Sequence, residues 1–507
     1  MIKANGFDAA RARLILLSTL LWGFAAHGFM FFNKFSFHDD VRLPFHIGAT
    51  VTSGRWFLQA LKFVCETFFG GLFSLPLFNG LLSLLLVAAS AVLAAELLRV
   101  RRRASCVCLA GVMAAFPAFT STLGYMYTAP FYMCGLLMAS CGALLVCRGG
   151  GRALPLLGCV LIACSIGVYQ ASLPTVMSLM LIYAVRELLE RGDGFDYWRE
   201  GFRLAFAVAL SLALYLAANH LCLHFAGAQL SEYESINTYG FGGWGEYVGR
   251  VCTAYREFFV SPRGKIRNMY PQLPMQILNL AIISFGAALA VVRAAHMPRG
   301  CACKLLLLVL LFPLAADFVY VMVDTALTHS LMMYSRVSAF LMFIVLLEAS
   351  TSDLRPHRAL YKVGIGAVAL MAVFFVRFAN ICYFKAEFQQ SQAISYFTRL
   401  VSRIESADGY SPDLPVAFLN DKRKLGFSAP QIREFDEIRL LPYYFTDTNQ
   451  MINNYAWKDF MRMWCGFAPI VIENTERFAE MPDVMMMPRY PTDGSIKVVD
   501  GTVVVKF

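Results

Sequence analysis

The sequence is poor in charge: only 15% of its 507 residues are Asp, Glu, Lys or Arg, against about 25% in soluble globular domains. A soluble protein of this length would form several domains and would need far more polar surface to cover them. Prolines number only 20 while aromatic residues reach 14%, which excludes a solvated, disordered chain. With 58% hydrophobic residues and a mean hydropathy of +0.56, the composition indicates a polytopic membrane protein.

Long basic runs, nucleotide loops and metal-ligand spacings are also missing. The net charge is +10, but no basic run exceeds Arg101–Arg103, so we expect the excess Lys and Arg to set topology rather than to bind nucleic acid. The Gly-rich stretch 239–244 has no Lys-Ser/Thr after it and no strand before it. Cys301 and Cys303 lack a second ligand pair for zinc. We therefore predict no metal site and no cofactor.

Apolar segments recur through the first three quarters of the chain. A helix needs about 20 apolar residues to cross a bilayer. The sequence predicts roughly eleven such helices, at 14–32, 77–98, 105–123, 126–147, 153–171, 173–188, 204–225, 274–293, 305–324, 337–350 and 363–384. The apolar stretch 54–75 is interrupted by charges and by Gly70-Gly71, which favours an interfacial amphipathic helix. The fold class is thus α-helical and polytopic.

The distribution of Lys and Arg predicts the orientation. With the N-terminus inside, the inner segments hold 19 Lys and Arg and the short outer loops hold four, as the positive-inside rule requires. Three longer segments then lie outside, at 33–76, 226–273 and 385–507. We therefore expect a transmembrane domain over 1–384 and an extracytoplasmic domain over 385–507.

The C-terminal segment has a soluble composition. Residues 495–506 predict a β-hairpin around Asp500-Gly501, because Asp-Gly suits a two-residue turn. A strand is expected at 415–419 and a helix at 388–406. Together these elements predict a small α/β domain.

Two adjacent acids, Asp39 and Asp40, follow the first helix. Carboxylates near a membrane face are costly unless they are solvated, paired or used. One of them could accept a proton from an acceptor hydroxyl while its neighbour positions it; alternatively, the pair lies in a solvated loop and caps a short helix. Nearby, Arg42 and Arg55 offer planar forks for phosphate oxygens. Trp56 suits either a sugar face or the headgroup level.

Other polar and aromatic residues belong to the same predicted outer face. Tyr169 and Gln170 form a polar group where a predicted helix reaches that face. Trp244 lies in the outer segment 226–273, where it could stack on a sugar ring or pack on the membrane surface.

Acids and a further cation lie in and beside later spans. Asp317 is inside an apolar span and Asp324 ends it; an intramembrane acid indicates either function or a hydrogen bond between helices. Arg336 adds a positive charge to the outer face. Acids, arginines and aromatic residues on one membrane face suit a phosphorylated, lipid-linked substrate that carries a sugar.

Several of these motifs together resemble the type II serotype-converting O-antigen glucosyltransferases. The resemblance is carried by Phe37–Asp40, Gly54–Trp56, Tyr169–Ser172, Asn420–Arg423 and Met487–Ile496. It implies a GT-C type enzyme that moves a hexose, with glucose expected, from a polyprenyl-phosphate carrier to a surface glycan such as O-antigen. The reaction would take place on the outer face of the bacterial inner membrane.

The resemblance also implies roles for the candidate residues. Asp39 or Asp40 would be the general base of an inverting displacement, with polyprenyl phosphate as the leaving group. Arg55 and Arg336, and more weakly Arg42, would hold the donor phosphate. The expected substrate-binding residues are Tyr169, Gln170, Trp56, Trp244 and Asp324. A divalent metal near the acid pair is compatible with the superfamily, but the sequence offers no further ligand set for one.

A transporter or flippase of lipid-linked sugars is the main alternative. That class predicts repeated halves and several charges at the bilayer midplane. The sequence has no internal repeat, and only Asp317 lies deep within a span. We therefore favour the glycosyltransferase, with a lipid-linked sugar donor, a glycan acceptor and membrane lipid as its partners.

Overall fold

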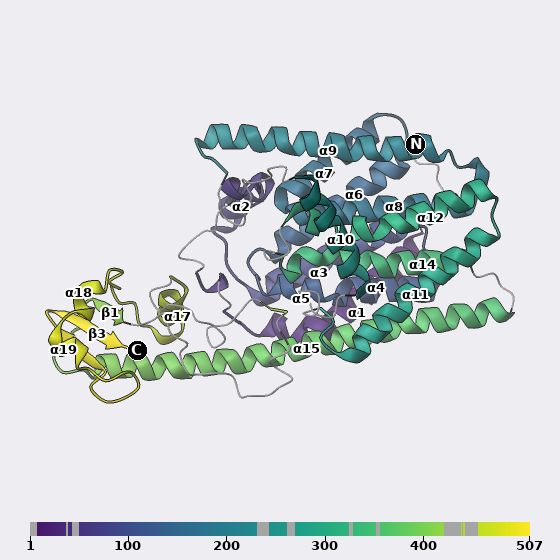
Figure 1. The fold of residues 1–507 in the computed structure, drawn as a ribbon. Helices are drawn as coiled ribbons and strands as arrows, with labels where there is room; N and C mark the ends of the chain where they lie inside the picture. The colour runs from purple at the N-terminus through teal and green to yellow at the C-terminus, as the bar shows by residue number, and fades with distance from the viewer. Residues whose placement is uncertain are drawn as a thin grey trace. The chain divides into compact units, whose positions relative to one another are not determined.

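The computed structural model describes residues 8–36, 39–42, 50–230, 243–260, 269–323, 328–350, 355–419, 438, 440–441 and 455–507. The chain forms two compact units (Figure 1). The helical unit comprises Met1–Phe32 and Gly48–Asn380, and the sheet unit comprises Asn33–Ile47 and Ile381–Phe507. Each unit is described by itself.

The helical unit contains helices of very different lengths. They are α1 (Ala9–Phe32), α2 (Trp56–Phe69), α3 (Pro76–Leu97), α4 (Arg103–Ala115), α5 (Pro117–Leu123), α6 (Ala129–Arg148), α7 (Ala153–Val168), α8 (Leu173–Arg191), α9 (Tyr197–Ala226), α10 (Trp244–Val260), α11 (Leu273–Ala295), α12 (Arg299–Ala316), α13 (Val319–Met322) and α14 (Ser338–Ser350). Short 3-10 helices include η2 (Val51–Ser53), η3 (Gln170–Ser172) and η8 (Ser330–Val337).

Length and composition allow ten of the described helical segments to cross a membrane. One of them joins α4 and α5, which are separated at Phe116 because Pro117 cannot donate a backbone hydrogen bond. The shorter apolar helix α7 corresponds to the predicted span at 153–171. This helical content is typical of a multi-pass membrane protein, as the composition predicts, while the count of eleven spans stays a prediction.

The helices differ in what surrounds them. The segments α4–α5 and η8–α14 are almost entirely buried, whereas most of α9 is exposed. Along α9 the exposed side chains include Phe202, Phe206 and Phe225. Large apolar side chains on the outside of a helix bundle are suited to lipid.

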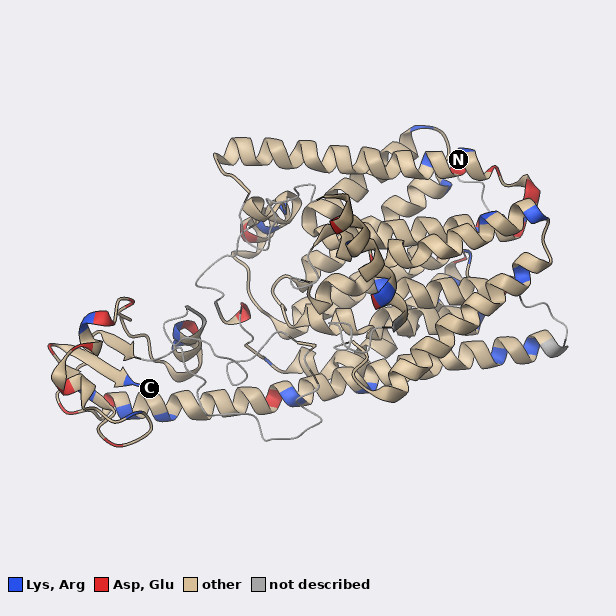
Figure 2. Ribbon diagram, in the orientation of Figure 1, with Lys and Arg blue, Asp and Glu red and all other residues tan. Residues whose placement is uncertain are grey.

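Many of the charged residues in the helical unit lie near one end of it. Figure 2 shows Lys and Arg near the ends at which α9 and α12 begin and where the long helix α15 (Arg355–Glu405) starts. Ion pairs join several of these residues, including Arg148 with Glu96 at 2.9 Å and Arg186 with Glu190 at 2.7 Å. These are the segments that the positive-inside rule predicts to be cytoplasmic.

Helix α15 merges two predicted elements. The expected span at 363–384 and the expected helix at 388–406 are one continuous helix. The residues between them, Lys385-Ala386-Glu387, are good helix formers and include neither Gly nor Pro. The change from apolar to polar composition therefore marks no break in the helix.

The sheet unit is built on three strands, β1 (Val416–Leu419), β2 (Ile496–Val499) and β3 (Thr502–Lys506), in the order β1-β3-β2. Strands β2 and β3 are antiparallel, and β1 pairs with β3 in parallel. Asp500 and Gly501 both have positive φ, at 47° and 67°, as a tight two-residue hairpin turn requires. The predicted strand and hairpin are thus confirmed.

Helices α17 (Tyr455–Cys465), α18 (Glu476–Ala479) and α19 (Pro482–Met485) complete the sheet unit. Its apolar core brings residues of α18 and α19 against strands β1 and β3, and consists of Ala417, Leu419, Phe478, Val484, Met487 and Val504. The tail motif Asn420–Arg423 lies outside the described residues.

Candidate functional site

The Gly54-Arg55-Trp56 motif forms a tight turn at the start of α2. The carbonyl of Thr50 accepts hydrogen bonds from the amides of Ser53 at 3.2 Å and Arg55 at 2.9 Å. Gly54 has a φ of +73°, and a Cβ there would lie 2.8 Å from both Gln170 Nε2 and the Tyr215 hydroxyl. Only glycine fits both the left-handed backbone and this close approach.

Side chains from two other elements hold this turn. Gln170 Nε2 donates to the carbonyl of Ser53 at 2.8 Å and to the Tyr215 hydroxyl at 3.3 Å. The Tyr215 hydroxyl in turn donates to the carbonyl of Gly54 at 3.1 Å. These bonds connect η2, η3 and α9, so segments more than a hundred residues apart form one polar junction.

Two tyrosines contact the guanidinium of Arg55. Its Nη1 donates to the Tyr132 hydroxyl at 3.4 Å, and its Cζ lies 5.1 Å from the centre of the Tyr169 ring. The Tyr132 and Tyr169 rings stack with centroids 4.6 Å apart. The tyrosines orient the cation through a hydrogen bond and a cation–π contact, and the Arg55 side chain remains partly exposed.

The buried polar atoms at this junction that have no hydrogen-bond partner among the described residues include Trp56 Nε1 and Asn219 Oδ1. Trp56 packs on α7, where a Cβ on Gly167 would lie 2.7 Å from its ring. Unsatisfied buried donors and acceptors are uncommon in proteins and are often satisfied by water or a ligand. We call the whole group the Arg55 cluster: Arg55, Trp56, Tyr132, Tyr169, Gln170, Tyr215 and Asn219.

Arg336 lies close by in the fold but is held differently. Its helix η8 packs against η3 and α5. Nε donates to Asp317 Oδ1 at 2.7 Å and Nη2 to Oδ2 at 2.6 Å, and Nη2 also donates to the carbonyl of Glu257. Arg336 is 4% exposed and Asp317 is fully buried. Asp317 therefore ties the end of α12 to η8, which is the structural one of its two predicted roles.

The acid pair belongs to the sheet unit. Asp40, in η1 (Asp40–Arg42), is 1% exposed and forms an ion pair with Lys34. Its Oδ1 has no hydrogen-bond partner among the described residues. The neighbouring Asp39 is partly exposed. The two acids thus differ, with one buried beside a cation and the other within reach of solvent.

The chain around the acid pair is anchored to α15. Gln390 Nε2 donates to the carbonyl of Lys34 at 2.9 Å, and the amide of Ser36 donates to Gln390 Oε1 at 3.2 Å. Helix η1 also packs against α17. These contacts hold the backbone on either side of Phe37 and His38, which are themselves outside the described residues.

Of the remaining candidates, only the Trp244 side chain belongs to the described residues. Trp244 is 90% exposed at the start of α10. Asp324 lies outside the described residues, as does the Arg42 side chain, whose backbone belongs to η1. Within the described parts of the chain, no three His, Cys, Asp or Glu side chains are grouped as metal ligands.

Several contributors were missed in the sequence. Tyr132, Tyr215 and Asn219 lie inside or beside apolar spans, and Lys34 and Gln390 support the acid pair. A polar side chain within an apolar helix is the available signal, because it is retained only where it finds a partner or a ligand. This signal identifies a candidate residue but does not predict which residue or ligand it contacts.

A helical unit with ten described segments that are long and apolar enough to cross a membrane is typical of an integral membrane protein. This is the class to which membrane-embedded transferases belong. The chain is a member of the GtrII glucosyl transferase family: the family model, described as glucosyl transferase GtrII, matches residues 28–348. No curated protein and no solved structure matches the chain. The protein is therefore a glycosyltransferase, and the resemblance seen in its sequence is confirmed.

Proposed function

We propose that the protein transfers glucose from a polyprenyl-phosphate carrier to a cell-surface glycan such as O-antigen. The observation that carries this proposal is the Arg55 cluster, in which two tyrosines orient a partly exposed arginine side chain within a membrane-spanning unit. A planar guanidinium is suited to phosphate oxygens. Membership of a glucosyl transferase family favours glycosyl transfer over transport.

The reaction is a displacement at the anomeric carbon of the donor sugar. The acceptor hydroxyl loses its proton to a carboxylate as its oxygen bonds to that carbon. The bond from the carbon to the phosphate oxygen breaks, and polyprenyl phosphate leaves with the electron pair. Attack opposite the leaving group inverts the configuration. Negative charge grows on the phosphate during this step, so a positioned cation lowers the barrier.

Arg55 is our main ligand for the donor phosphate. Arg336 uses Nε and Nη2 to bind the carboxylate of Asp317 and the carbonyl of Glu257, so we assign it to holding η8 against α10 and the end of α12. Tyr169 and Gln170 position Arg55 and the turn that carries it, and Trp56 presents its buried indole N–H nearby. Arg42, Trp244 and Asp324 stay predictions.

Among the two acids, Asp39 is our proposed general base. Its partial exposure allows contact with an acceptor hydroxyl, and a base must come within hydrogen-bond reach of the proton that it takes. Asp40 is buried against Lys34, and we assign it the role of positioning Asp39. The proposal assigns no step to a metal or to another cofactor.

The proposed location is the bacterial inner membrane, with the N-terminus in the cytoplasm and the C-terminal domain outside. The gathering of Lys and Arg at one end of the helical unit supports this orientation (Figure 2). Transfer on the outer face would give the enzyme access to a surface glycan.

Sugar transfer in membranes tests the proposal. Membranes containing the wild type, Asp39→Asn, Asp40→Asn or the exposed control Asp413→Asn at matched levels are given a panel of polyprenyl-phosphate hexoses and the surface glycan. We expect wild type and control to transfer glucose, and Asp39→Asn to be inactive. Absence of transfer from every donor would contradict the proposed function, whereas full activity of Asp39→Asn would contradict the choice of base.

A further inference from the structure

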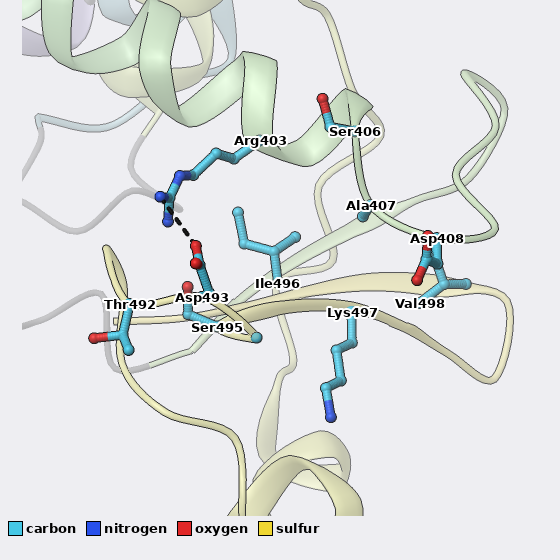
Figure 3. A pocket seen from close by; sticks show the side chains of 11 residues that line it. Arg403, Ser406, Ala407, Asp408, Thr492, Asp493, Ser495, Ile496, Lys497 and Val498 are labelled. Atoms are coloured by element: carbon cyan, nitrogen blue, oxygen red, sulfur yellow. Dashed lines mark ion pairs between the residues drawn. The ribbon is translucent and has the colours of Figure 1, made fainter.

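A polar cleft lies in the sheet unit, between the C-terminal end of α15 and the turn that enters β2 (Figure 3). Its volume is about 480 Å³, within the range of roughly 300–1,000 Å³ that is usual for small-ligand pockets. The lining residues are Arg403, Ser406, Ala407, Asp408 and the run Thr492–Val498. Neither the acid pair nor the Arg55 cluster contributes to it.

The turn that forms one wall is fixed by backbone hydrogen bonds. The amide of Thr492 donates to the carbonyl of Arg489 at 2.9 Å, and the amide of Ser495 donates to the carbonyl of Thr492 at 3.2 Å. Lys506 of β3 holds both ends of the turn, because its carbonyl accepts from the amide of Tyr490 and its amide donates to the carbonyl of Ser495. The cleft therefore has a preformed wall, built by the tail motif Met487–Ile496.

Arg403 connects this wall to α15. It pairs with Asp493 at 3.2 Å, donates to the carbonyl of Pro491, and lies 6.0 Å from the centre of the Tyr490 ring. Burial raises the pKa of the Tyr490 phenol, so this ring stays neutral beside the guanidinium. The contacts orient Arg403 along one side of the cleft (Figure 3).

The chemistry of the lining favours a neutral ligand with many hydroxyl groups. Asp408 and Asp493 bring two carboxylates, and in Figure 3 Lys497 leaves the strand on the side away from Arg403. Two carboxylates beside one guanidinium disfavour a phosphate or another anion. The carboxylates of the cleft can accept hydrogen bonds from the hydroxyl groups of a ligand. The guanidinium and hydroxyl groups of the cleft can donate hydrogen bonds to the oxygens of the same ligand.

Apolar side chains complete this lining. Ile496 and Val498 of β2 belong to the same cleft, and alternate residues of a strand share one face. Apolar side chains can pack on the C–H face of a sugar ring while polar groups bind its hydroxyls. A lipid chain would instead displace water from these charged groups and offer them no hydrogen bonds in return.

We propose that this cleft binds uncharged sugar residues of the acceptor glycan. The assignment to the acceptor rests on the proposed transfer reaction, while sugar binding itself does not. The protein would then hold its acceptor at a second site, separate from the residues that act on the donor. Asp408 and Asp493 are the residues that would give this site its preference for hydroxyl-rich ligands.

Binding is tested without catalysis, on the full-length protein in detergent micelles. Saturation-transfer-difference NMR is recorded with a panel of neutral tri- to hexasaccharides for the wild type, for Asp408→Asn/Asp493→Asn and for Asp483→Asn/Asp413→Asn. The last variant is a matched control, because its two acids are also exposed in the sheet unit and lie outside the cleft. Loss of each charge-assisted hydrogen bond should weaken oligosaccharide binding, and loss of both should lower the affinity about tenfold or more.

We expect at least one oligosaccharide to bind the wild type and the control, and to bind Asp408→Asn/Asp493→Asn at least about tenfold more weakly. No binding to the wild type, or equal affinity in all three proteins, would overturn the proposal. Sugar transfer is then assayed in the same preparations. If binding depends on the two acids but no donor supports transfer, sugar binding by the cleft is established and the proposed transfer reaction is refuted.

Discussion

Arg55 and Arg336 are two arginines of the helical unit whose surroundings differ. Arg55 lies between η2 and α2, and Arg336 lies in η8. Arg336 is almost fully buried and its fork is matched to the carboxylate of Asp317. Arg55 is partly exposed and is oriented by the hydroxyl of Tyr132 and the ring of Tyr169. A buried bidentate ion pair joins structural elements, whereas a partly exposed cation oriented by aromatic residues can receive an anion. Exposure, rather than residue type, therefore separates the supporting arginine from the proposed ligand.

Breaking the buried pair should have the largest effect. Asp317→Ala leaves the guanidinium of Arg336 buried without its carboxylate, which costs about 3–5 kcal/mol. We expect a lower midpoint of thermal unfolding in detergent and loss of activity as a consequence. The double variant Asp317→Leu/Arg336→Met removes both charges and should recover much of the stability. A double variant as unstable as the single one would contradict a purely supporting role.

Replacing Arg55 should affect catalysis more than folding. Arg55→Gln removes the proposed phosphate ligand, and loss of one such charge-stabilising group typically lowers the rate by about 10²–10³-fold. Arg55→Lys should recover only part of the rate, because an ammonium lacks the planar fork. Initial rates of glucose transfer at matched protein levels measure the losses in Arg55→Gln and Arg55→Lys. Thermal midpoints of both variants should match that of the wild type; if instead stability falls and the rate per folded molecule is unchanged, Arg55 is structural.

Gly54→Ala tests the turn that carries Arg55. The new Cβ would require a left-handed backbone and would collide with Gln170 and Tyr215, so we expect a loss of about 1–3 kcal/mol and reduced transfer. Gly227→Ala is the matched control, since Gly227 also has a positive φ but no atom within 4 Å of the added Cβ. Equal effects of the two substitutions on transfer would show that the close approach to Gln170 does not matter.

The smallest effect is expected for Tyr132→Phe. The hydrogen bond to Arg55 is long, at 3.4 Å, and we assign it the low end of the usual contribution, about 0.5 kcal/mol. The stacked ring is retained, so transfer should fall by no more than about threefold. Tyr132→Ala removes the ring as well and should cost clearly more activity. Equal transfer rates in Tyr132→Phe and Tyr132→Ala would show that the stacked ring of Tyr132 does not contribute to transfer.

Several parts of this architecture were predictable because their signals are local. The Asp500-Gly501 hairpin follows from turn chemistry alone, and the membrane helices follow from the length of the apolar runs. The pairing of Arg336 with Asp317 was not predictable, because the two lie nineteen residues apart in different elements. Nothing in the apolar run of α9 indicated that Tyr215 would bind the turn at Gly54.

The candidate site shows the same limit. Arg55, Tyr169 and Gln170 could each be identified as polar residues at the ends of apolar segments, and the structure brings them together. The difference between Asp39 and Asp40 could not be predicted, because adjacent acids have the same composition signal. Their burial depends on Lys34, on η1 and on the contacts that anchor this segment to α15 and α17.

The most direct test of the central claim is the affinity of the purified protein for polyprenyl phosphate, measured by tryptophan fluorescence titration for wild type and Arg55→Gln. Polyprenyl phosphate is the proposed leaving group, so the measurement needs neither an acceptor nor turnover. We expect saturable binding by the wild type that weakens by about tenfold or more in Arg55→Gln, and near-wild-type binding by the Asp317→Leu/Arg336→Met variant. Equal affinities for wild type and Arg55→Gln would contradict the role of Arg55 as the phosphate ligand.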